Sequence, residues 1–120
     1  MEGDHSIETC YAATKATLLE VFAQLERQGV ALEGMLLKPN MVVSASSASN
    51  RASAETVGAM TVDCFKRTIP AAMPGIVFLS GGQGDDEATA NLNAITLKRP
   101  ESAHRGRSAT RLVEASRRHR

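Results

Sequence analysis

Two short apolar runs, each preceded by a helix-forming segment, constrain the fold of this chain most strongly. The first run covers residues 30–43 and has a continuous apolar centre at residues 35–37. The second covers residues 75–79 and reads GIVFL. A continuous apolar centre is typical of a buried parallel strand, and parallel strands need long crossover connections, usually helices. The sequence therefore predicts an α/β arrangement in the order helix, strand, helix, strand, helix.

Three segments carry helical signals. Residues 6–28 repeat apolar or small side chains at three- and four-residue spacing, and Gly29 suits the end of that helix. Ser53 is placed to cap a second helix over residues 54–68. Three acidic residues open a third expected helix at residues 85–95, where they complement its dipole. Because two parallel strands do not make a stable sheet alone, the pattern is that of a section of a larger α/β protein.

The composition is that of a small domain with an aliphatic core. The chain has 120 residues, of which 42% are hydrophobic and only 3% aromatic. No apolar run approaches the roughly 20 residues that cross a bilayer, and the acidic, polar first residues differ from a secretory signal. Cys10 and Cys64 show no metal-ligand spacing, so we expect two reduced thiols, a cytoplasmic location and no metal site.

Charge is distributed unevenly along the chain. Residues 1–97 hold 6 Lys and Arg against 11 Asp and Glu, whereas residues 98–120 hold 8 against 2. We therefore expect a folded part at residues 1–97 and an irregular basic tail at residues 98–120. The tail could be a disordered extension, a segment that binds nucleic acid through its arginines, or out-of-frame translation of GC-rich DNA. We favour the third explanation, and the lack of aromatic residues in the tail argues against base stacking.

Lys38 ends the first apolar run, within the segment LEGMLLKPNMVV. Alternation along a strand puts Leu36 and Lys38 on one face, with Leu37 and Pro39 on the other. Active sites of α/β proteins lie at the carboxyl ends of their parallel strands. Apolar surroundings disfavour the charged form of a lysine, and the neutral amine can attack a carbonyl group. The alternative is a lysine whose stem packs on the strand while its ammonium group reaches water.

Ser80, Gly81 and Gly82 directly follow the second apolar run, within LSGGQ. Glycine lets the backbone approach a ligand closely, and successive N–H groups can form a concavity that binds an anion. The start of the third expected helix lies just beyond and adds a favourable dipole. The alternative is a plain turn between a strand and a helix.

Five segments together resemble class I fructose-bisphosphate aldolases. In chain order they read GDHSIETC, GVALEGMLLKPNMV, NRASAETV, RTIPAAMPGIVFLSGGQ and EATANLNAI. They cover nearly all of residues 1–95, and their order and separation also match the family. The family fold is a (β/α)₈ TIM barrel, so the resemblance implies an α/β partial barrel from the fifth helix to the seventh.

The resemblance also implies a reaction and its residues. Lys38 matches the family's Schiff-base lysine, and Ser80, Gly81 and Gly82 match the loop that holds a substrate phosphate. The implied activity is a glycolytic lyase that reversibly cleaves fructose 1,6-bisphosphate into dihydroxyacetone phosphate and glyceraldehyde 3-phosphate. The implied partner is a sugar-phosphate substrate, and the implied reaction uses no metal and no cofactor. We also expect no membrane association, and we favour nucleic-acid binding less than the sugar-phosphate substrate. Full-length relatives are expected to be homo-oligomers.

The chain departs from the family in two places. A whole barrel needs about 250 residues, and the first five strands have no counterpart here, nor do the acidic residues that handle protons. After the third helix the family continues into an eighth strand with a segment like FSYGRAL, whereas this chain reads TLKRPESAHRGRSATRLVEASRRHR. We therefore expect a truncated aldolase with little activity alone. The alternatives are an inactive, non-enzymatic piece and a basic-tailed nucleic-acid-binding protein.

Overall fold

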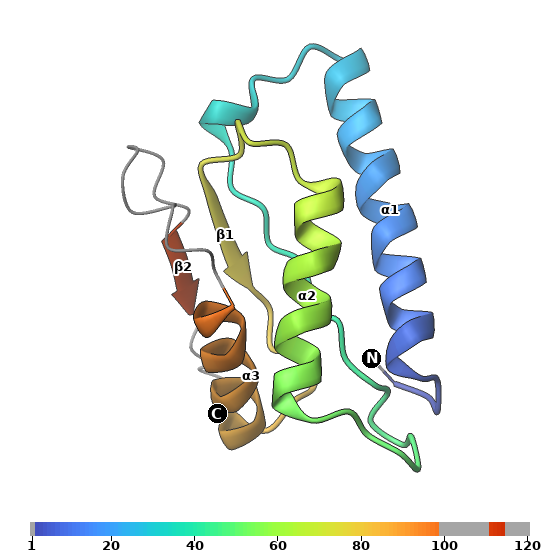
Figure 1. Ribbon diagram of the computed structural model, residues 1–120. Coiled ribbons are helices and arrows are strands. Elements are labelled where there is room, and N and C mark those ends of the chain that lie inside the picture. The colour runs from blue at the N-terminus through green and yellow to red at the C-terminus, as the bar shows by residue number, and fades with distance from the viewer. Residues whose placement is uncertain (1, 99–110, 115–120) are drawn as a thin grey trace, which may run out of the picture.

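The computed structural model describes residues 2–98 and 111–114. Three α-helices make up most of the described chain, with a short 3₁₀-helix and two short strands between and after them (Figure 1). The elements, in chain order, are α1 (Ile7–Arg27), η1 (Leu32–Gly34), α2 (Ala54–Thr68), β1 (Gly75–Phe78), α3 (Asp85–Leu97) and β2 (Arg111–Glu114). The three expected helices are confirmed, with ends that differ by at most two residues from those predicted.

The helix ends follow from local chemistry. Ser6 caps α1, because its hydroxyl oxygen accepts a hydrogen bond from the Thr9 N–H. Ser53 caps α2 in the same way through the Thr56 N–H, as the sequence predicts. Gly29 follows α1 with φ of 67°, a left-handed conformation that glycine adopts without steric penalty.

The three helices lie side by side, with α2 between α1 and α3 (Figure 1). At the crossing of α2 and α3, Gly58 packs directly on the backbone of Ala94. A Cβ atom built on Gly58 would lie only 2.8 Å from the Ala94 carbonyl carbon. Glycine at this position therefore sets how closely the two helices approach.

The first expected strand is not formed, and an extended segment takes its place. Residues 30–43 begin with η1 and then run extended along one edge of β1, without forming a strand of their own. Their pairing is a single parallel bridge, between Leu37 and Ile76. The expectation of a strand over residues 30–43 is therefore wrong, although the single bridge has the expected parallel direction.

Pro39 accounts for the short pairing. Leu37 uses both backbone groups, donating to the Gly75 oxygen at 3.2 Å and accepting from the Val77 N–H at 2.9 Å. The next donor in the ladder would be residue 39, and proline has no N–H. Its carbonyl still accepts from the Leu79 N–H at 3.2 Å. The extended segment therefore continues beside β1 while the regular two-way ladder stops.

The opposite edge of β1 pairs with β2, in parallel, from Gly75 opposite Arg111 to Phe78 opposite Glu114. We expected an irregular tail over residues 98–120, and the strand at 111–114 corrects that expectation. An unpaired strand edge readily takes another strand, which is the role β2 fills here. Residues 99–110 and 115–120 of the expected tail lie outside the described residues.

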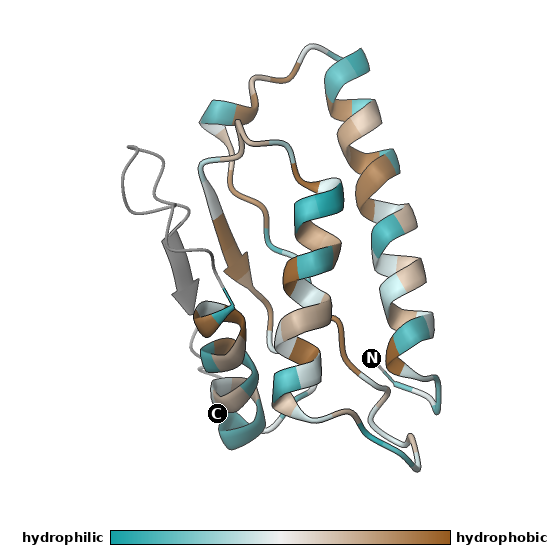
Figure 2. Ribbon diagram, viewed as in Figure 1, coloured by the Kyte–Doolittle hydropathy of each residue, from teal (hydrophilic) through white to brown (hydrophobic). Residues whose placement is uncertain are grey.

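The core lies between the helices on one side and β1 with its neighbouring extended segment on the other. Figure 2 shows hydrophobic residues along β1 and recurring at intervals along α1 and α2. The rings of Phe65 on α2 and Phe78 on β1 stack with centroids 5.7 Å apart. The buried apolar residues include Leu18, Phe22, Met41, Val42, Val43, Val57, Cys64, Met73, Ile76 and Ile95.

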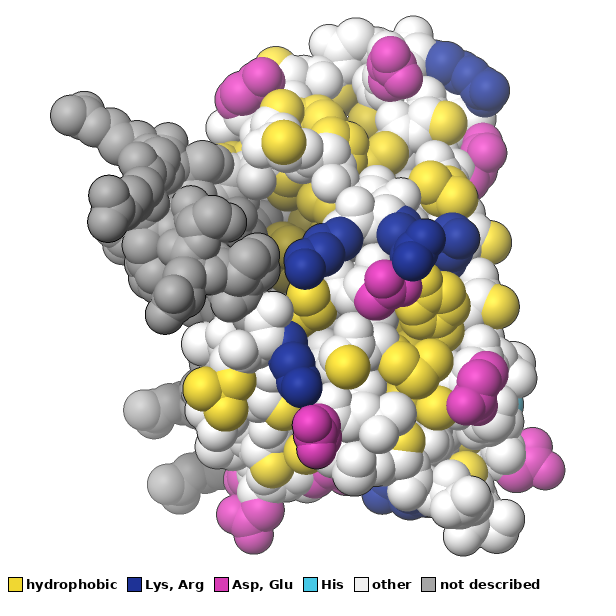
Figure 3. Space-filling view, viewed as in Figure 1, with side chains coloured by type: hydrophobic (Ala, Val, Ile, Leu, Met, Phe, Trp, Pro, Cys, Tyr) yellow, Lys and Arg dark blue, Asp and Glu magenta, His cyan; other side chains and the backbone are white. Residues whose placement is uncertain are grey.

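Among the described residues, none of the helices combines the length and the apolar character that a membrane crossing requires. On the face of the molecule seen in Figure 3, Lys and Arg side chains are interspersed with Asp and Glu over α1 and α2. Mixed charge of this kind is an ordinary solvated surface and does not form a single-sign patch on that face.

Candidate active site

The lysine segment, LEGMLLKPNMVV, and the glycine turn, which follows β1 at Ser80, Gly81 and Gly82, lie at the same end of the paired strands. Lys38 directly follows the bridging residue Leu37, and Ser80 directly follows Leu79. The hydrogen bond from the Leu79 N–H to the Pro39 oxygen holds the two segments in register just before the turn. In α/β proteins this carboxyl end of parallel strands is where ligands bind.

Lys38 itself is exposed, which corrects the expectation of apolar surroundings. The predicted alternation is present, because Leu36 and Lys38 are exposed while Leu37 is half-buried and Pro39 is buried. Leu36 is 63% exposed, a high value for a leucine inside an apolar run. Alternation assigns residues to a face but does not supply the elements that would cover it, and the described residues leave this face open.

A groove of about 570 Å³ runs beside Lys38, between the extended segment and α1. Its walls combine apolar and polar side chains from both elements. They include His5, Cys10, Thr14, Leu18, Leu37, Lys38, Pro39, Asn40 and Leu79. The lysine therefore borders a concave surface that is open to solvent.

The glycine turn is a tight reversal between β1 and α3. The Gln83 N–H donates to the Ser80 oxygen at 3.2 Å, and the two residues between them, Gly81 and Gly82, have φ of 61° and 80°. Two successive positive φ values are the signature of a type I′ turn, which other residues adopt at a cost. The N–H groups of Gly81 and Gly82 are not used by the hydrogen bond that closes the turn.

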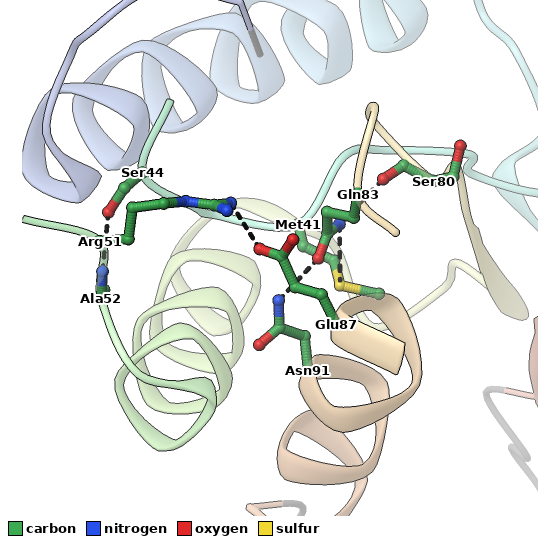
Figure 4. A network of polar contacts seen from close by, with 8 residues as sticks. All are labelled: Met41, Ser44, Arg51, Ala52, Ser80, Gln83, Glu87 and Asn91. Atoms are coloured by element: carbon green, nitrogen blue, oxygen red, sulfur yellow. Dashed lines mark hydrogen bonds and ion pairs between the residues drawn. The ribbon is translucent and has the colours of Figure 1, made fainter. Parts of the chain in front are cut away.

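A buried amide pair supports this turn from below, and sequence reasoning missed it. The Gln83 side chain donates to the Ser80 oxygen at 2.9 Å and lies 3.7 Å from the Met41 sulfur. Asn91, on α3, donates to the Gln83 side-chain oxygen at 2.6 Å. Figure 4 shows Gln83 between Met41 and Asn91. A signal was available, because Asn91 shares the buried side of α3 with Ile95, four residues on.

The same set of polar contacts reaches α1. The Asn40 amide donates to the Thr14 hydroxyl at 3.1 Å and to the Met41 carbonyl at 2.9 Å. Asn40 lies two residues beyond Lys38. The segment that carries the lysine is therefore tied to α1 on one side and to the glycine turn on the other.

Acidic residues stand close to the turn without being part of it. The first turn of α3 contains Asp85, Asp86 and Glu87. Glu87 forms a 2.5 Å ion pair with Arg51, which lies in the loop before α2 (Figure 4). No group of three or more His, Cys, Asp or Glu suited to hold a metal occurs in the described residues.

The groups whose pKa is clearly perturbed by their surroundings lie away from this site. Hydrogen bonds from Arg67 and Tyr11 lower the pKa of Asp63, on the outer side of α1 and α2. Burial raises the pKa of the Cys64 thiol, and both Cys10 and Cys64 are free and buried. A raised thiol pKa disfavours the reactive thiolate, so Cys64 has the character of a core residue.

Comparisons with known proteins give the class of the molecule. The sequence matches the family described as "Glycolytic: Fructose-bisphosphate aldolase class-I" over residues 1–105. The chain therefore belongs to the class I fructose-bisphosphate aldolase family.

Individual relatives agree with this assignment. A probable class 1 fructose-bisphosphate aldolase of Xanthomonas campestris is 55% identical over 95 residues, which are 79% of this chain and 28% of that protein. The fructose-bisphosphate aldolase of Plasmodium falciparum is 48% identical over 99 residues, which are 82% of this chain and 27% of that protein. The chain thus spans just over a quarter of the length of these relatives.

The structure has a similar neighbour. Plasmodium falciparum fructose-bisphosphate aldolase, solved in complex with TRAP and a small-molecule inhibitor, superposes with a TM-score of 0.83 and 42% sequence identity. The match covers 94% of this chain and 31% of that one. The arrangement of α1, α2, β1 and α3 is therefore one that a solved aldolase also contains.

Proposed function

We propose that this chain carries the Schiff-base lysine and the phosphate-binding turn of an aldolase that cleaves fructose 1,6-bisphosphate. Lys38 is the proposed catalytic residue, and Ser80, Gly81 and Gly82 are the proposed phosphate-binding residues. The observation that carries this proposal is the register of the two segments, which brings Lys38 and the glycine turn to one end of the paired strands.

The proposed chemistry uses the lysine amine as a nucleophile. The neutral Nζ of Lys38 attacks the ketone carbon of the sugar phosphate, and loss of water then gives an iminium ion. The bond between the carbons α and β to the iminium carbon then breaks. Its electron pair moves toward the iminium nitrogen and leaves an enamine, while the hydroxyl group on the β carbon loses its proton and becomes the aldehyde of glyceraldehyde 3-phosphate. Protonation of the resulting enamine and hydrolysis release dihydroxyacetone phosphate and restore the amine.

The glycine turn would contribute by positioning the substrate. Backbone N–H groups of Gly81 and Gly82, at the tip of the turn, are suited to donate hydrogen bonds to phosphate oxygens. The strand β1 ends just before the turn, and the helix α3 begins just after it. These two elements therefore fix the position of the turn relative to Lys38. Fixed phosphate contacts would hold the ketone carbon near the amine.

We further propose that the fold is a portion of a (β/α)₈ barrel. In this assignment α1 precedes the sixth strand, residues 37–39 are that strand, and β1 is the seventh strand. The parallel pairing and the similarity to a solved aldolase support this assignment. The division into an aldolase-type part at 1–97 and a distinct basic tail at 98–120 remains part of the proposal. Reading the other two frames of the coding DNA for an eighth strand tests the out-of-frame origin.

Full activity would require groups beyond those described. Proton transfer in the proposed reaction needs an acid or a base, and no carboxylate lines the groove beside Lys38. The exposed lysine favours a second candidate, a non-catalytic piece of an aldolase. We propose a cytoplasmic site of action, in keeping with the two free, buried thiols, and a homo-oligomeric state for full-length relatives.

Borohydride trapping tests the proposed function. The chain is incubated with dihydroxyacetone phosphate, reduced, digested and mapped by mass spectrometry, with the Lys38→Arg variant and a full-length aldolase alongside. An adduct on the Lys38 peptide that is absent in Lys38→Arg supports a Schiff-base role. If the full-length aldolase is labelled and Lys38 is not, the chain does not carry out this chemistry by itself.

A further inference from the structure

We infer that Gln83 and Asn91 are positioning residues that hold the glycine turn in its anion-binding shape and tie it to the lysine segment. This inference rests on the proposed function, because the anion it concerns is the substrate phosphate. Neither side chain would touch the phosphate. Both act through the backbone of residues 80–82.

The first step is the burial of Gln83. Gln83 is only 4% exposed, and its side chain lies directly beneath the turn formed by the residues before it. Burying an amide is unfavourable unless its hydrogen-bonding groups are satisfied. Its nitrogen donates to the Ser80 oxygen, and its oxygen accepts from Asn91, so both ends of the amide are used.

The second step is the fixed orientation of the amide. Asn91 is 3% exposed and donates its side-chain nitrogen to the Gln83 oxygen. The Ser80 carbonyl can only accept, so it fixes the Gln83 amide with its nitrogen toward the turn, and the Gln83 oxygen is then left to accept from Asn91. The Ser80 carbonyl therefore receives two donors, the side chain and the backbone N–H of Gln83. Rotation of the peptide between residues 80 and 81 would break both.

The third step is the link to the lysine segment. The Gln83 nitrogen also approaches the Met41 sulfur, three residues beyond Lys38 (Figure 4). Met41 is buried, and its carbonyl accepts from Asn40. A displacement of Gln83 would therefore disturb both the turn and the packing of the segment that carries the amine.

The absence of charge on Gln83 and Asn91 also suits a site for phosphate. Both members of the pair are neutral, so they satisfy the Ser80 carbonyl without adding negative charge beneath a site for a phosphate dianion. The nearby carboxylate of Glu87 is paired with Arg51 instead. A carboxylate in place of the Gln83 amide would repel the phosphate and could not donate to Ser80 when ionised.

Three variants test the inference in the full chain. Gln83→Met removes the amide at similar volume, and Asn91→Asp replaces the donor with an acceptor. Asn93→Asp makes the same charge change on an exposed residue of the same helix. For each variant the affinity for inorganic phosphate and the amide NMR signals of Gly81 and Gly82 are measured well below its unfolding temperature.

We expect Gln83→Met and Asn91→Asp to weaken phosphate binding about tenfold, the equivalent of one lost hydrogen bond, with Asn93→Asp within about twofold of wild type. The Gly81 and Gly82 signals should shift in the first two variants and not in the third. A fourth variant, Gln83→Glu, should regain wild-type-like signals at acidic pH, where its protonated carboxyl can again donate to Ser80. Gln83→Met, which has no carboxyl group at this position, should not recover.

The outcomes separate the inference from the proposed function. If wild type binds no phosphate, the proposed function fails for this chain, and the phosphate role of the pair fails with it. In that case the amide NMR signals of Gly81 and Gly82 still show whether Gln83 and Asn91 hold the turn in its shape. Unchanged glycine signals, or equal phosphate affinity in Asn91→Asp and Asn93→Asp, would overturn the inference.

Discussion

The backbone N–H of Leu79 donates to the carbonyl oxygen of Pro39 over 3.2 Å. This hydrogen bond joins the residue after Lys38 to the residue before Ser80, although the two lie far apart in sequence. It is the last contact of the parallel pairing before the chain turns at Gly81 and Gly82. The relative position of the amine and the glycine turn therefore depends on the strand register.

Hydrogen exchange should detect this register directly. We expect the amides of Leu37, Val77 and Leu79 to be protected, because each donates to a backbone carbonyl in the pairing. The exchange rate of the Gly34 amide is the comparison, because its hydrogen bond lies within the short η1 helix of the same segment and does not cross the pairing. Exchange of the Leu79 amide as fast as that of an exposed loop would contradict the register.

Thr61 ties α2 to the lysine segment. Its hydroxyl oxygen accepts from the Val42 N–H at 3.0 Å, and both residues are 0% exposed. Thr61→Val keeps the shape but leaves a buried N–H without its partner, so we expect a loss of about 1–3 kcal/mol in the free energy of unfolding. Thr61→Ser keeps the hydroxyl and should lose less. Urea denaturation of both variants checks the order.

The close crossing of α2 and α3 depends on Gly58. An added Cβ would lie 2.8 Å from the Ala94 carbonyl carbon, and backbone cannot move aside as a flexible side chain can. We expect Gly58→Ala to destabilise the chain by about 1–3 kcal/mol, despite the better helix propensity of alanine. Gly34→Ala is the control, because nothing lies within 4 Å of its Cβ position. Equal unfolding midpoints for the two variants would show that the helices do not pack as described.

The contact between Tyr11 and Asp63 should make stability depend on pH. The Tyr11 hydroxyl donates to the Asp63 carboxylate at 2.6 Å, and Arg67 donates to the same oxygen. These bonds lower the pKa of Asp63, so its stabilisation is present above the ordinary aspartate pKa and is lost as pH falls through the lowered value. The Asp63 contact raises the pKa of Tyr11, so that stabilisation is lost as pH rises through the raised value.

Two variants separate these effects. Asp63→Asn should flatten the pH dependence of the unfolding free energy below about pH 4 and above about pH 10. Tyr11→Phe should flatten mainly the alkaline side. If the unfolding free energies of wild type and Asp63→Asn change with pH in the same way across the whole range, the contact does not exist in solution.

The sequence predicted the features that depend on local chemistry. Ser53 as a cap, Gly29 after the first helix and the apolar run of β1 follow from hydrogen-bonding capacity, backbone freedom and burial of neighbouring residues. The parallel direction followed from the helix between the runs. These signals lie within a few residues of the element that they specify.

Features that depend on distant partners were harder to predict. The missing N–H of Pro39 ended the ladder early, which only the pairing with β1 reveals. Alternation assigned Lys38 to a face but could not say that this face is open. Its spacing places Asn91 on the helix face of Ile95, but its contact with Gln83 depends on how α3 packs under the turn.

The most direct test of the account compares two ketones as labels for Lys38. If Lys38 and the glycine turn form one site, as we propose, borohydride trapping with dihydroxyacetone phosphate should label Lys38 about tenfold faster than trapping with unphosphorylated dihydroxyacetone. Lys66, an exposed lysine on α2, is the internal control and should react equally slowly with both. Equal rates for the two ketones at Lys38, or equal labelling of Lys38 and Lys66, would contradict a joint site.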